Sequence, residues 1–205
     1  MKKSVFGFAF ILLACTAVWP DVIDVFPDRG IGLQEAIDQA RSGDVIQLAE
    51  GVFKTDAAIR IENKSDLEIT ADSAVWIICR DVYQDVIQIT SCREVEINGV
   101  HAKHEEWLEE YECNGAVMSV ADSSGVSIVD CELNGCGAFG VYVEYSDGVT
   151  IDSCVIQWNS FAGVYVYASG PVYVTNNRMF DNTAAIEAYD VSELQVYGNV
   201  IANNY

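Results

Sequence analysis

Apolar and polar residues alternate in short stretches that recur along the chain, and a polar turn precedes each stretch. The central apolar positions of these stretches are Leu48, Ile69, Ile97, Ile128, Ile151, Val174 and Val196. Successive positions differ by 21, 28, 31, 23, 23 and 22 residues, so the period is about 23. A fixed period of this length indicates one structural unit stacked many times, in which each unit buries the apolar face of its neighbour.

Three copies of the repeat, which begin at Gly125, Gly148 and Pro171, align closely. Each copy contains three short strands in which apolar side chains alternate with polar ones. The inward positions expected in the first copy are Val126, Ile128, Leu133, Val141 and Val143. No hairpin turn separates the strands of one copy, so we expect each strand to pair in parallel with its counterpart one coil later.

Polar side chains also recur at the repeat period. The columns predicted from equal phase are Asn159, Asn182 and Asn204; Asn177 and Asn199, in phase with Cys131 and Cys154; and Ser123, Ser146 and Ser169. Stacked Asn side chains hydrogen-bond along the axis of the stack and satisfy backbone groups in tight turns. These columns therefore support the same register as the apolar positions.

Four of the seven cysteines fall into two pairs of equal phase, Cys131 with Cys154 and Cys113 with Cys136. Stacked coils place the members of each pair about 4.8 Å apart along the axis. That spacing lies within the Cα range of a disulfide, but the parallel side-chain directions make a bridge awkward. We favour a ladder of buried thiols, and disulfides remain the alternative because an exported chain commonly forms them.

With these strands the repeat resembles the pectin lyase-like right-handed parallel β-helix family, and the likeness covers about residues 30–205. The opening is similar too, because Gly32–Arg41 reads as a short amphipathic helix with Leu33 and Ile37 on one face. The resemblance implies an all-β, right-handed parallel β-helix (solenoid) of six to seven coils, capped by this N-terminal helix. No polar capping segment follows the last coil, so we expect an open end. Two interpretations stay open: the last coil is an edge used for self-association, or the chain is a truncated gene product.

The N-terminus reads as a targeting segment, in which two lysines precede an apolar stretch too short to span a bilayer. The segment Leu12–Cys15 resembles the lipobox of bacterial lipoproteins. The resemblance implies a signal peptide over residues 1–14, lipidation of Cys15, and a lipidated linker over residues 15–29. Neither Thr16 nor Ala17 is the Asp that would argue for retention at the inner membrane, so the resemblance implies an outer-membrane lipoprotein held by its lipid alone. A plain secretory leader is the alternative.

Charge narrows the classes of partner. The chain has 11 basic and 31 acidic residues, with a formal net charge of -20. Such a surface repels nucleic acid and other polyanions unless divalent cations intervene, so neutral or cationic partners are favoured. The hydrophobic content of 51% excludes disorder as the main state.

Proteins of the resembled family commonly bind polysaccharide along the face formed by the strand Gly-Val-Tyr-Val and its equivalents. The outward side chains predicted on this face are Tyr142, Glu144, Tyr165, Tyr167, Glu187 and Tyr189. Tyrosine rings offer flat apolar surfaces to sugar C–H groups, while hydroxyls and carboxylates offer hydrogen bonds. The alternative is structural, because Tyr also favours exposed strand positions and packs on itself.

The longest repeat carries an insertion from His101 to Cys113, which contains both histidines of the chain. His101, His104 and Glu105 are candidate metal ligands, because His-x-x-His beside a carboxylate can hold a metal. Either histidine is also a candidate general base. The alternative is a solvated acidic helical turn that packs on the coil.

Catalytic motifs of the family's galacturonan hydrolases and pectate-type lyases do not occur in the chain. The sequence therefore predicts a surface-anchored protein that binds polysaccharide or another envelope component, without a resident cofactor. One alternative is a polysaccharide lyase or glycoside hydrolase that uses His101 or His104 with Glu144 and Glu187. Calcium as a bound cofactor stays open as an alternative to the absence of any cofactor. Another is a structural lipoprotein that self-associates through its C-terminal coil.

Overall fold

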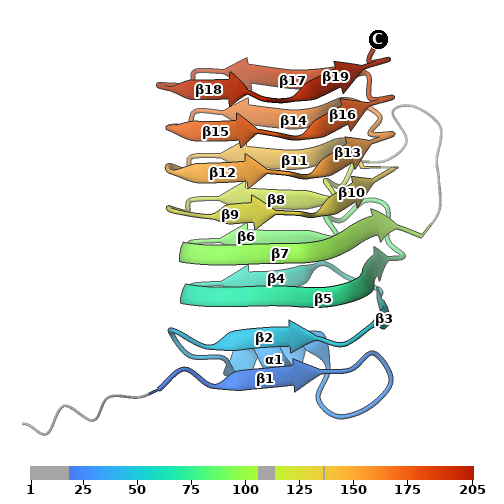
Figure 1. The fold of residues 1–205 in the computed structure, drawn as a ribbon, viewed down its shortest axis with the longest axis vertical. Helices are drawn as coiled ribbons and strands as arrows, with labels where there is room; N and C mark the ends of the chain where they lie inside the picture. Colours follow the sequence, from blue (N-terminus) through green and yellow to red (C-terminus); the bar gives the residue numbers. More distant parts are fainter. Residues whose placement is uncertain (1–18, 106–113, 136) are drawn as a thin grey trace, which may run out of the picture.

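The computed structural model describes residues 19–105, 114–135 and 137–205. In this part of the chain about seven coils stack along one long axis (Figure 1). Strands pair in parallel with their counterparts in neighbouring coils, as predicted. A short helix lies at the N-terminal end of the stack.

One side of the stack is a parallel sheet of six described strands, which we call the front sheet. In spatial order its strands are β17 (Ala184–Tyr189), β14 (Ala162–Tyr167), β11 (Phe139–Glu144), β8 (Met118–Ala121), β6 (Ile87–Thr90) and β4 (Ile59–Glu62). Each strand comes from a different coil, so residues about 23 positions apart become neighbours on this sheet.

The other described strands form a second sheet, which is folded into two columns. The first column contains β1 (Val22–Val25), β2 (Val45–Leu48), β9 (Ser127–Val129), β12 (Val149–Asp152), β15 (Val172–Thr175) and β18 (Leu194–Tyr197). The second column contains β3 (Gly51–Thr55), β10 (Glu132–Asn134), β13 (Val155–Gln157), β16 (Arg178–Phe180) and β19 (Val200–Ala202). Two long strands, β5 (Ser65–Cys79) and β7 (Arg93–His104), run through both columns.

The inside of the coils is a continuous apolar core. The inward positions predicted for the first aligned copy are all fully buried: Val126, Ile128, Leu133, Val141 and Val143. Each such burial stabilises the fold by about 1.5–3 kcal/mol. Packing also explains the repeated glycine of the front sheet, because a Cβ at Gly140 would lie 2.4 Å from Cγ2 of Ile156 and 2.6 Å from the carbonyl oxygen of Gly163.

Polar ladders hold the corners between the strands. The Asn177 side chain is fully buried, accepts the Cys154 N–H at 2.8 Å and donates to the Ile151 carbonyl at 2.8 Å. Asn182 accepts the Asn159 N–H at 3.0 Å in the same way at another corner. At the corner after the front sheet, serine hydroxyls accept backbone N–H groups from the preceding coil: Ser123 from Cys92, Ser146 from Ser123, and Ser169 from Ser146. The predicted polar columns are therefore present.

Cys131 and Cys154 are buried free thiols, as predicted for this pair. The hydrogen bond with Cys131 raises the pKa of the Cys154 thiol, and burial adds to the shift. Cys113 and Cys136 lie outside the described residues.

Helix α1 (Leu33–Gln39) buries Leu33, Ala36 and Ile37, consistent with the predicted N-terminal cap. The β-helix begins earlier than predicted, because β1 lies within the expected linker and pairs with β2. The last residue of β1, Val25, is fully buried in the core. Residues 1–18, which contain the predicted signal peptide and Cys15, lie outside the described part. Among the described residues no helix is both long and apolar enough to cross a membrane.

Candidate functional site

The outward side chains of β11, β14 and β17 form two columns on the front sheet. We call this surface the tyrosine face, and its residues are Tyr142, Tyr165 and Glu187 in one column and Glu144, Tyr167 and Tyr189 in the other. The register is the predicted one, because outward positions alternate with buried valines such as Val143 and Val166 along each strand.

Tyr165 lies at the centre of an aromatic cluster on this face. Its ring centroid is 5.6 Å from that of Tyr142 and 5.7 Å from that of Tyr189. Two further rings extend the cluster: Phe139 lies 4.9 Å and Phe161 6.2 Å from Tyr165. Both phenylalanines were missed by the sequence analysis. The signal available for them is that each lies one or two positions before the glycine of its repeat strand, Gly140 or Gly163.

Two carboxylates are tied to the tyrosine hydroxyls. The Tyr142 hydroxyl donates to Oε2 of Glu144 at 2.7 Å, and the Tyr189 hydroxyl donates to Oε2 of Glu187 at 3.3 Å. Burial raises the pKa of Tyr142, and the hydrogen bond to Glu144 adds to the shift. The negative charge of Glu187 raises the pKa of Tyr189. Both phenols therefore remain protonated at neutral pH, and the face presents rings, hydroxyls and carboxylates together.

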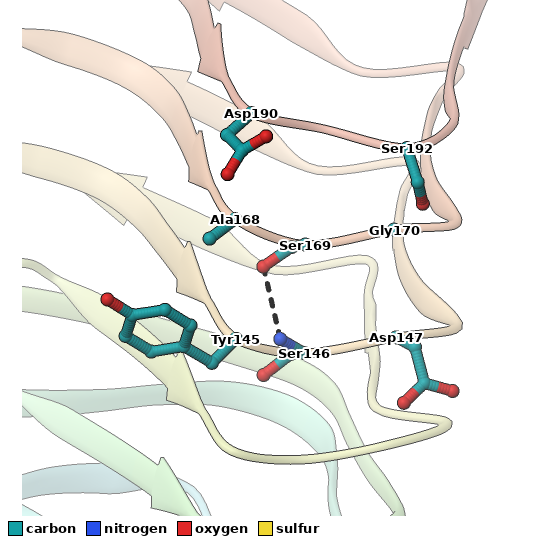
Figure 2. A pocket seen from close by; sticks show the side chains of 8 residues that line it. All are labelled: Tyr145, Ser146, Asp147, Ala168, Ser169, Gly170, Asp190 and Ser192. Atoms are coloured by element: carbon teal, nitrogen blue, oxygen red, sulfur yellow. Dashed lines mark hydrogen bonds between the residues drawn. The ribbon is translucent and has the colours of Figure 1, made fainter.

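A groove of about 410 Å³ lies at the corner that follows the front sheet, and we call it the corner groove (Figure 2). Its lining residues are Tyr145, Ser146, Asp147, Ala168, Ser169, Gly170, Asp190 and Ser192. Tyr145 is 57% exposed, and its ring stands edge-on to Tyr167 at 5.7 Å. Because Tyr167 belongs to the tyrosine face, the groove and the face form one continuous surface. The neighbouring Tyr167 phenol raises the pKa of Tyr145.

The predicted histidine site is not assembled. His101 and His104 lie in β7, not in a loop. Successive side chains of a strand alternate between its two sides, so these two residues, three apart, point to opposite sides. His104 is buried, and its Nε2 donates to the Gln84 carbonyl at 2.8 Å; burial lowers its pKa. His101 instead lies on the outer side, with Nδ1 3.4 Å from Oε2 of Glu132.

Glu105 also points elsewhere, because it forms ion pairs with Lys54 and Arg80. The structure therefore does not bring His101, His104 and Glu105 together as metal ligands. Across the ranges that the structure describes, no group of three or more His, Cys, Asp or Glu side chains is arranged to hold a metal ion.

The proposed catalytic partners are also separated. The histidines belong to the second sheet, whereas Glu144 and Glu187 lie on the front sheet. The two glutamates are two coils apart and in different columns. Their backbones are therefore separated by about 9.6 Å along the axis and about 6.6 Å along the strands. Each carboxylate is bonded to a tyrosine of its own strand, so the structure does not pair them across a single sugar bond.

Comparison with known proteins agrees with this architecture. Residues 114–205 match the family model described as right handed beta helix region. A candidate glycosyl hydrolase from Parabacteroides merdae ATCC 43184 has a similar crystal structure, with a TM-score of 0.70 and 13% identity over 87% of this chain and 97% of that chain. The ORF18 protein of Geobacillus virus E2 also has a TM-score of 0.70, with 18% identity over 86% of this chain and 42% of that chain.

No curated protein sequence matches the chain. At these identities the structural likeness shows the fold alone. The family model over residues 114–205 and the coil architecture together confirm the predicted fold, a right-handed parallel β-helix.

Proposed function

We propose that this protein binds polysaccharide through the tyrosine face. The observation that carries the proposal is the chain of ring contacts from Tyr142 through Tyr165 to Tyr189 across three coils. Glu144 and Glu187 accept hydrogen bonds from two of these tyrosine hydroxyls. Aromatic rings stack on the apolar faces of sugars, and adjacent carboxylates accept hydrogen bonds from sugar hydroxyls. A carbohydrate-related role also agrees with the description of the Parabacteroides merdae protein.

Exposure favours binding over a purely structural aromatic stack. Tyr189 is 54% exposed, Tyr167 is 37% exposed, and the adjoining Tyr145 is 57% exposed. Rings that served only to pack against each other would bury more of this area, since burial of apolar surface is what stabilises such a stack. A polymer laid along the columns covers these rings.

The predicted lipid anchor at Cys15 extends the proposal to the cell envelope. A lipidated N-terminus would hold the β-helix at the outer-membrane surface, where it meets polysaccharide or another envelope component. Mass spectrometry of the membrane fraction tests this extension separately, because a mature N-terminus at Cys15 carrying acyl chains is expected.

The binding test uses the chain from Thr16 onward with a panel of neutral, acidic and amino polysaccharides, with and without calcium. Both retention on the polymer and release of new chain ends are scored. Tyr165→Ala is expected to weaken retention about tenfold, because it removes the central ring of the cluster. Tyr173→Ala is the matched control, since Tyr173 lies on β15 in the other sheet.

Retention that survives Tyr165→Ala, or no retention on any polymer, overturns the proposal. New chain ends would make the protein a carbohydrate-active enzyme instead. Glu144→Gln and Glu187→Gln would then show whether the carboxylates of the tyrosine face take part in the cleavage.

A further inference from the structure

The C-terminal half of the stack carries almost only negative charge. Residues 114–205 contain one basic residue, Arg178, against ten acidic ones. The acidic residues are Asp122, Asp130, Glu132, Glu144, Asp147, Asp152, Asp181, Glu187, Asp190 and Glu193. Arg178 lies on β16 in the second sheet, with its guanidinium 5.8 Å from the centroid of the Phe180 ring. It therefore does not neutralise the tyrosine face.

Among the described strands of the front sheet, the only positively charged side chain on the outer side is Arg60 of β4. Strands β6 and β8 separate β4 from β11, so Arg60 is about 14 Å along the axis from the first tyrosine strand. That distance exceeds the Debye length of about 8 Å at physiological ionic strength. Glu144 and Glu187 thus act on a ligand without a competing positive charge.

The corner groove continues this negative surface. Asp147 and Asp190 line it from different coils, as Figure 2 shows, and both residues are exposed. The Ser146 and Ser169 hydroxyls are already used, because they donate to the carbonyls of Glu144 and Tyr167. The groove therefore offers a ligand two carboxylates and the exposed Tyr145 ring, a combination that suits an ammonium group.

We propose that the polysaccharide is an amino-sugar polymer, whose protonated amines bind the carboxylates of the tyrosine face and enter the corner groove beside Tyr145. This inference rests on the proposed function and specifies its substrate class. The groove volume of about 410 Å³ falls in the range of small-ligand sites. Rings and carboxylates have separate tasks: the rings hold the sugar faces, and the carboxylates select the positive charge.

The test compares three oligosaccharides of equal length by calorimetry at low ionic strength in mildly acidic buffer, where sugar amines are protonated. They are built from glucosamine, from N-acetylglucosamine and from galacturonate, so that the ligands carry positive, zero and negative charge. The glucosamine oligosaccharide is expected to bind about tenfold more tightly than its N-acetylated form. Several partly exposed ion pairs between ammonium groups and carboxylates would together account for a difference of this size. The galacturonate oligosaccharide is expected to bind weakest.

Asp190→Asn tests the groove itself and should reduce the glucosamine preference about threefold. Asp181→Asn is the matched control, because both residues have left-handed backbones, with φ of 55° and 57°, and both changes remove one charge. Asp181 lies outside the groove, so this variant should keep the preference. Circular dichroism and thermal unfolding verify that both variants fold.

Equal affinity for the glucosamine and N-acetylglucosamine ligands overturns the inference and leaves the proposed function standing. An equal loss in Asp181→Asn and Asp190→Asn also overturns it, since the attraction would then come from net charge. If none of the oligosaccharides binds and no polysaccharide is retained, both the inference and the proposed function fail.

Discussion

The Tyr142 hydroxyl donates a 2.7 Å hydrogen bond to Oε2 of Glu144, two residues further along the same strand. Both side chains point outward because positions i and i+2 share one side of a strand. The phenol thus presents its ring to Tyr165 and its hydroxyl to a carboxylate. This one contact joins the aromatic and the acidic parts of the tyrosine face.

The first prediction concerns the ionisation of Tyr142. Glu144→Gln should lower the pKa of this phenol while leaving it above the ordinary value of about 10, because burial, the larger cause, remains. Alkaline absorbance titration measures it, with Tyr142→Phe identifying the contribution of this phenol. Glu62→Gln, in the same column on β4, is the control and should leave the titration unchanged.

The same shift has a sign for stability. A raised native pKa means that the native state holds its proton longer than the unfolded chain does. The contribution of Tyr142 is therefore complete below the unfolded pKa of about 10 and declines as pH rises toward the native pKa. An identical titration in Glu144→Gln and the parent protein would contradict the assigned hydrogen bond.

The second prediction concerns the Asn ladder. Asn177→Ala leaves the Cys154 N–H and the Ile151 carbonyl without their side-chain partner inside the stack. We expect the free energy of unfolding to fall by about 2–4 kcal/mol, measured by urea denaturation. Asn114→Ala, at an exposed position, should stay within about 0.5 kcal/mol of the parent. A loss in Asn177→Ala as small as that of the control would show that the ladder does not stabilise the corner.

The repeat period made the fold and the register of the tyrosine face predictable. In a stack, residues separated by one period become neighbours, so a count along the sequence places Tyr142 beside Tyr165 and Tyr165 beside Glu187. Alternation then decides which side chains are inside, as for Val143 and Val166. Both rules depend only on spacing, and both are satisfied.

The predicted site at His101 and His104 is not assembled because these residues lie in a strand, and the prediction placed them in an inserted loop. Residues three apart lie on one side of a helix but on opposite sides of a strand. His101 and His104 belong to β7, so one faces outward while the other is buried. The corner groove was missed for another reason: Tyr145 occupies a left-handed turn position with φ of 47°, and the strand pattern does not describe where such a side chain points.

The third prediction uses the buried histidine. Burial lowers the native pKa of His104, so below about pH 6.5 the unfolded chain binds a proton that the native state excludes. The stability contributed by neutral His104 is present above that pH and is lost as pH falls through the native pKa. Urea midpoints measured across this range should decline with acidification in the parent protein and in His101→Gln. His104→Gln should lack this component, and an unchanged slope in that variant would contradict the assignment.

The last prediction concerns thiol reactivity. The thiolate is the reactive form of cysteine, and the contact with Cys131 together with burial raises the pKa of Cys154. Cys154 is also 1% exposed, so an alkylating reagent needs both local opening and deprotonation to reach it. We therefore expect no labelling of Cys154 in the native protein at mildly alkaline pH and full labelling in denaturant, by peptide mass spectrometry.

The adjacent residue supplies a control, because Ser153 is exposed on the turn directly before the buried thiol. Ser153→Cys should label rapidly in the native state, which shows that reagent and pH are adequate. Rapid native labelling of Cys154, or recovery of a Cys131–Cys154 disulfide from the non-reduced protein, would contradict the thiol ladder. Protection of Cys154 beside a reactive neighbour would instead show that the coil interior, and not the reagent, decides which cysteine reacts.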